Sequence, residues 1–133
     1  MSEQTTAGTS QTASALLGAV ALTIDYSNGV QKSFAFLPWR PDMDVLDVLR
    51  AAESMKPGLG FEFHVTLKSD REGRARGFMA SIDGIQADQT NHKWLLWIND
   101  HFFGHEWSTH GEFGPGTEVN NGDVVFLKLV GGQ

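Results

Sequence analysis

Residues 42–55 read DMDVLDVLRAAESM, and this is the one segment of the chain whose pattern clearly predicts a helix. Asp42 or Asp44 can cap its N-terminus by accepting hydrogen bonds from backbone N–H groups. A Pro-Gly pair at positions 57–58 follows the segment and ends the helix. Five apolar side chains fall on one helix face: Val45, Val48, Leu49, Ala52 and Met55. The sequence therefore predicts a single helix over about residues 43–55 with one apolar stripe that packs against another element.

Strand patterns lie on both sides of this helix. Apolar and polar residues alternate over residues 20–26, and Asn28-Gly29 then predicts a hairpin turn into residues 30–37. Residues 93–98 read KWLLWI and are apolar on both faces, which is typical of a central strand. Further strands are predicted at residues 61–67, 78–82, 101–103 and 124–130.

The order of these elements predicts an α+β fold. A hairpin, one helix and then several strands can bury one helix stripe and one sheet face if the helix packs on a mixed sheet. This is the arrangement of a β-grasp, in which the first and last strands pair centrally beneath the helix. We therefore expect a β-grasp-like mixed sheet with a single packed helix.

Composition and charge limit the classes of protein. The 133 residues suit one domain, predicted at residues 15–133, and the Ser/Thr-rich residues 1–14 are predicted to form a disordered tail. The 16 acidic and 10 basic residues give a formal net charge of −6, which disfavours a nucleic-acid partner. The absence of cysteine excludes disulfides and thiolate metal sites.

No segment predicts insertion into a membrane or export. The longest apolar stretch, residues 15–22, is too short to span a bilayer. Residues 1–14 contain no Lys or Arg, so the basic leader of a signal peptide is missing. We therefore expect a cytoplasmic protein without a membrane span.

Several short motifs occur in an order that resembles one protein family. They are the Asn28-Gly29 hairpin, the helix at residues 45–49, and the runs SIDGI at residues 81–85, WLLWIN at 94–99 and GDVV at 122–125. Together they resemble the uncharacterised domains related to the C-terminal β-domain of transcobalamin and intrinsic factor. The resemblance covers about residues 20–130 and implies a β-grasp-like fold. It also implies a cobalamin-like ligand, which in the eukaryotic relatives lies between this domain and a second, α-barrel domain. Asp100 stands where members of the family commonly have glycine.

The end of the sequence resembles a second group. Residues 121–132 read NGDVVFLKLVGG and are similar to the tails of β-grasp sulfur carriers and ubiquitin-like modifiers. The chemistry of those proteins needs a terminal diglycine whose carboxylate is adenylated. Here Gln133 follows Gly131-Gly132, so cleavage would have to come first. A processed carrier or modifier is therefore the alternative function.

Aromatic residues concentrate in residues 94–107. On one strand, Trp94 and Trp97 point to opposite faces, and only one face can be covered by the helix. We expect Trp97, which shares its face with Asn99, to be the more exposed of the two. Trp107 is the second choice, because residues 104–117 contain four glycines and are predicted to form a long loop. If that loop folds back instead, it buries the aromatic residues.

This region is the predicted contact surface of a non-catalytic binding module. Its ligand is expected to be a small planar molecule or a protein partner. The predicted ligand-binding residues are Trp94, Trp97, Asn99, Phe102, Phe103 and Trp107.

The same region contains histidines, which allow a third function. His101, His105 and His110 are candidate metal ligands, although histidines in loops are most often polar surface residues. The sequence contains no HExxH motif, nucleophile elbow or phosphate-binding loop. We therefore predict no metal site and no enzymatic activity.

Overall fold

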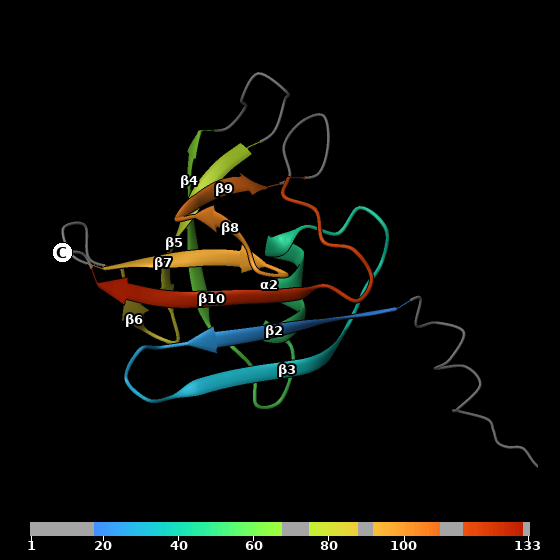
Figure 1. Ribbon diagram of the computed structural model, residues 1–133, viewed down its shortest axis with the longest axis horizontal. Helices are drawn as coiled ribbons and strands as arrows, with labels where there is room; N and C mark the ends of the chain where they lie inside the picture. Colours follow the sequence, from blue (N-terminus) through green and yellow to red (C-terminus); the bar gives the residue numbers. More distant parts are fainter. Residues whose placement is uncertain (1–17, 68–74, 88–91, 110–115, 132–133) are drawn as a thin grey trace, which may run out of the picture.

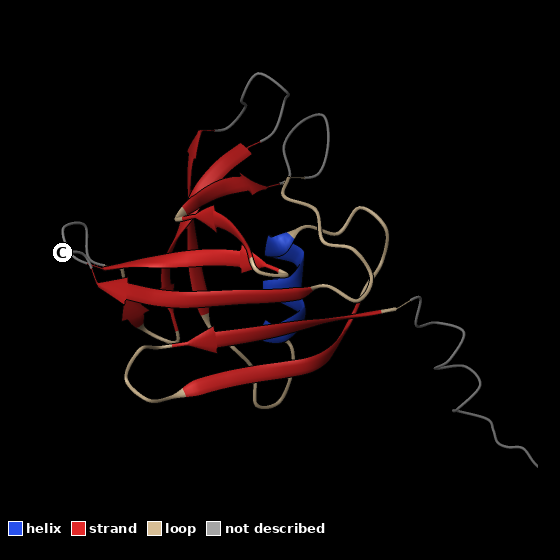
Figure 2. Ribbon diagram, in the orientation of Figure 1, coloured by secondary structure: helices blue, strands red, loops and turns tan. Residues whose placement is uncertain are grey.

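The computed structural model describes residues 18–67, 75–87, 92–109 and 116–131, which form two β-sheets and one helix (Figures 1 and 2). The predicted tail, residues 1–14, lies outside the described residues. The elements are β2 (Ala19–Asp25), β3 (Gln31–Pro38), α2 (Val45–Glu53), β4 (Phe61–Leu67), β5 (Ala75–Ile82), β6 (Ile85–Gln86), β7 (His92–Ile98), β8 (His101–Gly104), β9 (Glu106–Thr109) and β10 (Val124–Gly131). The expected α+β class is confirmed.

The larger sheet has five strands in the order β3-β2-β10-β7-β8. Its central pair, β2 and β10, is parallel, and Val124 stands beside Ala21. The other neighbours are antiparallel, which makes the sheet mixed. The expectation that the first and last strands lie side by side in the middle of the sheet holds for the described residues.

The smaller sheet is built from β4, β5 and β6, and β9 pairs with β5. In the view of Figure 1, β4 and β5 run steeply across β7 and β10.

The predicted loop over residues 104–117 is wrong in its first part, because residues 106–109 form the strand β9. Alternation in this strand turns Trp107 and Thr109 into the interior, and burial of the tryptophan favours the strand over a loop.

Helix α2 is shorter than predicted. Asp44, not Asp42, is the N-cap, and a reciprocal capping box joins its side chain to Asp47 N at 3.1 Å. The helix ends at Glu53, so Met55 lies beyond it and is 36% exposed instead of packed. The rest of the predicted stripe is fully buried: Val45, Val48, Leu49 and Ala52.

The buried Asp44 side chain also fastens the segment that leads into β10. Its Oδ2 accepts hydrogen bonds from Thr109 Oγ1 at 3.3 Å and from Gly116 N at 3.4 Å. A backbone hydrogen bond strengthens this connection, because Val45 N donates to Thr117 O at 3.2 Å. A Cβ at position 116 would lie 2.2 Å from the Cα of Thr109, so this close approach requires glycine. The start of the helix and the chain after β9 are thus joined at one carboxylate.

A second carboxylate, Asp83, joins the two sheets at the turn between β5 and β6. It accepts hydrogen bonds from the Tyr26 hydroxyl, from Lys32 Nζ at 2.9 Å and from Gly60 N at 2.8 Å. Burial alone would raise the pKa of Asp83, but these hydrogen bonds and the charge of Lys32 outweigh it and hold the pKa below the ordinary value. Burial raises the pKa of the Tyr26 hydroxyl, and its hydrogen bond to the Asp83 carboxylate and the charge of that carboxylate add to the increase.

Replacing Leu49 by alanine tests the packing of the helix. Leu49 is fully buried, so Leu49→Ala should lower the free energy of unfolding by roughly 2–5 kcal/mol. Met55→Ala is the matched control and should change it by about 0.5 kcal/mol, because Met55 lies at the surface. The measurement is denaturant unfolding of both variants. An unchanged midpoint for Leu49→Ala would contradict the packing of this helix on the sheet.

The lowered pKa of Asp83 predicts a dependence of stability on pH. A carboxylate whose pKa is lower in the folded state stabilises the fold above the ordinary value of 3.8, and this contribution is lost as the pH falls through the folded-state pKa. At pH 6, Asp83→Asn should therefore be destabilised by roughly 1–3 kcal/mol, and the difference from the unmodified chain should shrink below pH 4. Thermal unfolding between pH 6 and pH 2.5 measures this difference, with Asp100→Asn at an exposed turn as the control. A difference for Asp83→Asn that stays constant over this range would show that ionisation of Asp83 does not stabilise the fold.

Candidate functional site

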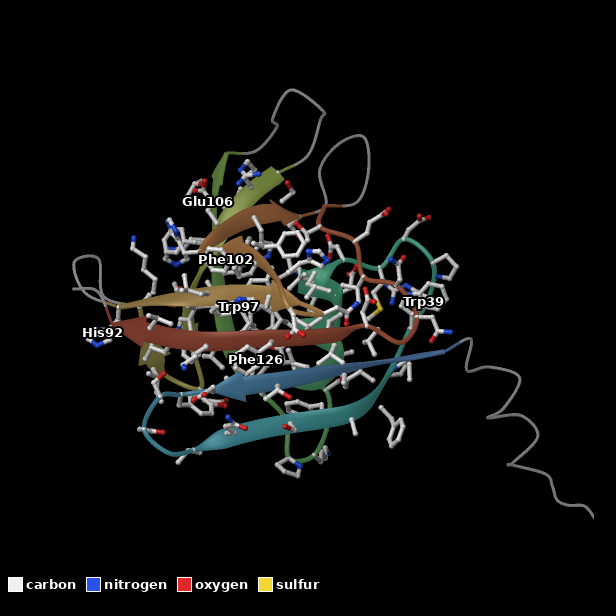
Figure 3. The ribbon with its side chains drawn as sticks, viewed as in Figure 1. Trp39, His92, Trp97, Phe102, Glu106 and Phe126 are labelled. Carbon is white, nitrogen blue, oxygen red and sulfur yellow. The ribbon has the colours of Figure 1, made fainter. Side chains whose placement is uncertain are left out.

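Three aromatic side chains meet on the larger sheet: Trp97 from β7, Phe102 from β8 and Phe126 from β10 (Figure 3). The centroid of the Trp97 ring lies 5.1 Å from that of Phe102 and 5.7 Å from that of Phe126. The strand register explains the contact, because Trp97 pairs with both Phe102 and Phe126. We call these three residues the open-face cluster.

Alternation along the strands places this cluster on the face that the helix does not cover. The neighbours of Trp97 in β7, Leu96 and Ile98, are buried in the core with the helix, and so are Val125 and Leu127 beside Phe126. Side chains of successive residues point to opposite faces, so the cluster points away from α2. In the view of Figure 2, the helix lies behind the sheet.

The cluster continues into a row of side chains across the whole sheet. Phe126 stands beside Thr23 in β2, and Thr23 stands beside Ser33 in β3. The two hydroxyls are hydrogen-bonded at 3.2 Å. The row is thus aromatic at the β8 edge, where Phe102 is 60% exposed, and polar at the β3 edge.

A β-bulge adds another exposed aromatic side chain at the β3 edge. Phe34 pairs with Leu22 and Leu37 with Val20, so residues 35 and 36 stand opposite Ala21 alone. The sequence pattern places Phe34 and Phe36 on one face, but the bulge separates them. Phe34 is half-buried against the core, whereas Phe36 is 83% exposed.

The predicted contact residues separate into two groups. Trp97 is half-buried and more exposed than Trp94, as expected, and Phe102, Phe103 and Asn99 are exposed. Phe103 follows Phe102 in β8 and is the extra residue of an irregularity, because Trp97 pairs with Phe102 and Leu96 with Gly104. Asn99 forms part of the turn, where its Oδ1 accepts from Val124 N at 2.9 Å.

The other two tryptophans belong to the core. Trp94 is 1% exposed, and its Nε1 donates to Ile85 O at 3.1 Å. Trp107 is 2% exposed and contacts Phe63, with 5.6 Å between the ring centroids. Its Nε1 is buried without a hydrogen-bond partner among the described residues. The expectation that Trp107 lies in a loop able to move toward a ligand is therefore wrong.

The sequence reasoning missed Phe126 and Phe36. Phe126 could have been found, because residues 124–130 read VVFLKLV and are apolar on both faces, as residues 93–98 are. Phe36 could not, since its exposure depends on the bulge, which alternation does not reveal.

Two other sites were candidates from the sequence: a histidine metal site and the C-terminal diglycine. Within the described part of the chain, no three His, Asp or Glu residues are grouped to hold a metal ion. His101 and His105 are exposed, and His110 lies outside the described residues.

Gly131 is the last residue of β10 and pairs with His92, so the diglycine begins inside the sheet; Gly132 is not described. No described helix is long and apolar enough to cross a membrane.

No family, curated protein or solved structure matches this chain.

Proposed function

We propose that this chain is a non-catalytic binding module that engages a protein partner through the open-face cluster. The observation that carries the proposal is an aromatic cluster on the side of the sheet that the described helix leaves uncovered. Exposed aromatic side chains gathered on one surface are typical of binding sites. Tryptophan and phenylalanine are also enriched in protein–protein interfaces, and tryptophan often contributes much of the binding energy.

The geometry of the rings favours a protein over a small planar molecule at this site. The ring of Trp97 is tilted by 48° to Phe102 and by 55° to Phe126. Rings packed in this way present edges and a broad apolar surface, not two parallel walls with a slot between them. Val124 and Phe36 extend the exposed apolar area on the same sheet. A partner with a complementary apolar surface can cover all of these side chains.

We infer a β-grasp-like topology for the scaffold of this site. Three observations support it: the parallel pair β2 and β10 lies at the centre of the sheet, the β2–β3 hairpin flanks it on one side, and one helix packs on one face. The resemblance to the transcobalamin-related domains is part of this proposal for the fold. A cobalamin-like ligand remains a prediction from that resemblance alone.

Two substitutions with opposite expected effects test the proposed surface. Phe102→Ala should change the free energy of unfolding by about 1 kcal/mol or less, because the ring is mostly exposed. It should weaken partner binding by about 2 kcal/mol or more, or roughly 30-fold. Trp107→Ala should instead cost about 3–5 kcal/mol of stability, because that ring is buried.

The binding measurement has two steps. Partners are captured from the lysate of the source cell on the unmodified chain, on Phe102→Ala and on the control Val65→Ala, whose side chain is exposed on the smaller sheet. A partner lost only with Phe102→Ala is then purified, and its Kd is measured directly. If Phe102→Ala and Phe36→Ala both keep every partner at unchanged affinity, the open face is not a binding surface. If the molecule lost is a small planar compound, the site is a ligand site instead.

A further inference from the structure

A cavity of about 260 Å³ lies apart from the open-face cluster, where the start of β7 meets β4, β5 and β9. Sites for drug-sized ligands usually enclose about 300–1,000 Å³, so this cavity suits a smaller molecule. None of the residues that line it belongs to the open-face cluster. What it can bind follows from its wall and its rim.

The wall of the cavity is apolar. Phe78 and Ala87 line it and are partly exposed, so they supply accessible apolar surface. Trp94 and Met79 also line it but are almost fully buried. The one polar atom of the Trp94 side chain already donates to Ile85 O, so the tryptophan has no hydrogen bond left to offer. The wall therefore favours a flat apolar body.

The rim contains one acidic side chain, and its charge is already balanced. Glu106 Oε2 accepts a hydrogen bond from Thr66 Oγ1 at 2.9 Å, and Glu106 Oε1 lies 3.8 Å from Arg76 Nε. This carboxylate is therefore held in place on the protein and is poorly suited to bind a cationic ligand.

The basic side chains of the rim have no such partners. Lys93, His92 and His105 line the cavity, and no hydrogen bond or ion pair joins their side chains to another residue that the structure describes. Lys93 and Glu106 are the charged residues that line the cavity, and Arg76, which lies outside the lining, already pairs with Glu106. The positive charge of Lys93 is therefore left without a partner among the described residues. The chain as a whole has a formal charge of −6. The cavity thus offers one positive charge that the described residues leave unpaired, which favours an anionic group.

We infer that this cavity binds a small aromatic carboxylate, with its ring against Phe78 and Ala87, close to Trp94, and its carboxylate beside Lys93. The ring would gain from removal of apolar surface from water, and the carboxylate would gain a charge-assisted hydrogen bond. This inference is independent of the proposed protein partner, because the two sites share no side chain.

Titration of the full chain with phenylacetate and indole-3-acetate, followed by NMR, tests the inference. The indole N–H signal of Trp94 should shift on binding, while that of Trp97 should not. Phenylacetamide has the same shape without the charge and should bind at least about fivefold more weakly. Absence of a Trp94 shift with both acids up to about 10 mM, well above a millimolar Kd, would overturn the inference. So would shifts that concentrate at Trp97.

Matched lysine substitutions test the role of the charge. Lys93→Gln should weaken phenylacetate binding about fivefold or more, whereas Lys128→Gln should not change it, because Lys128 lies on β10 and does not line the cavity. Equal affinity of the two variants would show that Lys93 does not hold the carboxylate. Phe102→Ala should bind phenylacetate normally, so failure at the open face and failure at the cavity can be told apart.

Discussion

One nine-residue helix has to cover one face of a five-stranded sheet, and the rest of the fold follows from this constraint. A helix of that length spans about 14 Å, whereas five strands are about 19 Å wide. The helix alone cannot seal the core, and the smaller sheet completes it: Met79 and Ile82 from β5 and Trp107 from β9 join the same buried cluster. The described part of the chain has no second helix for the opposite face, and the open-face cluster lies there.

Mutual packing explains how a folded chain keeps aromatic residues on an uncovered face. Trp97 lies between Phe102 and Phe126 and is half-buried by its neighbours. The row continues with the hydroxyls of Thr23 and Ser33, so its aromatic part ends at β10. Phe102, at the β8 edge, is the most exposed member of the cluster. The aromatic part of the row is therefore confined to β7, β8 and β10.

Local patterns predicted the parts of this structure that depend on local physics. Alternation located most strands, and the capping preference of aspartate identified Asp44 as a possible start of the helix. The errors arise where contacts between residues far apart in the sequence determine the local structure. Residues 106–109 form a strand because they pair with β5 and because Trp107 is buried in the core. Neither contact can be predicted from the glycine-rich sequence of residues 104–117. The open-face cluster joins residues on three strands, so the pattern of residues 124–130 can mark Phe126 as a candidate, but the register of the sheet is needed to place it beside Trp97.

The parallel pairing of β2 with β10 also sets an order of events during synthesis. Ala21 has its partner at Val124, 103 positions later, so the middle of the sheet cannot close until nearly all of the described chain has emerged. Until then β2 can pair with β3, and its other edge stays open. Contacts between residues so far apart in sequence slow folding, and an unpaired edge invites pairing with other chains. The nascent chain is therefore most prone to aggregation just before β10 docks.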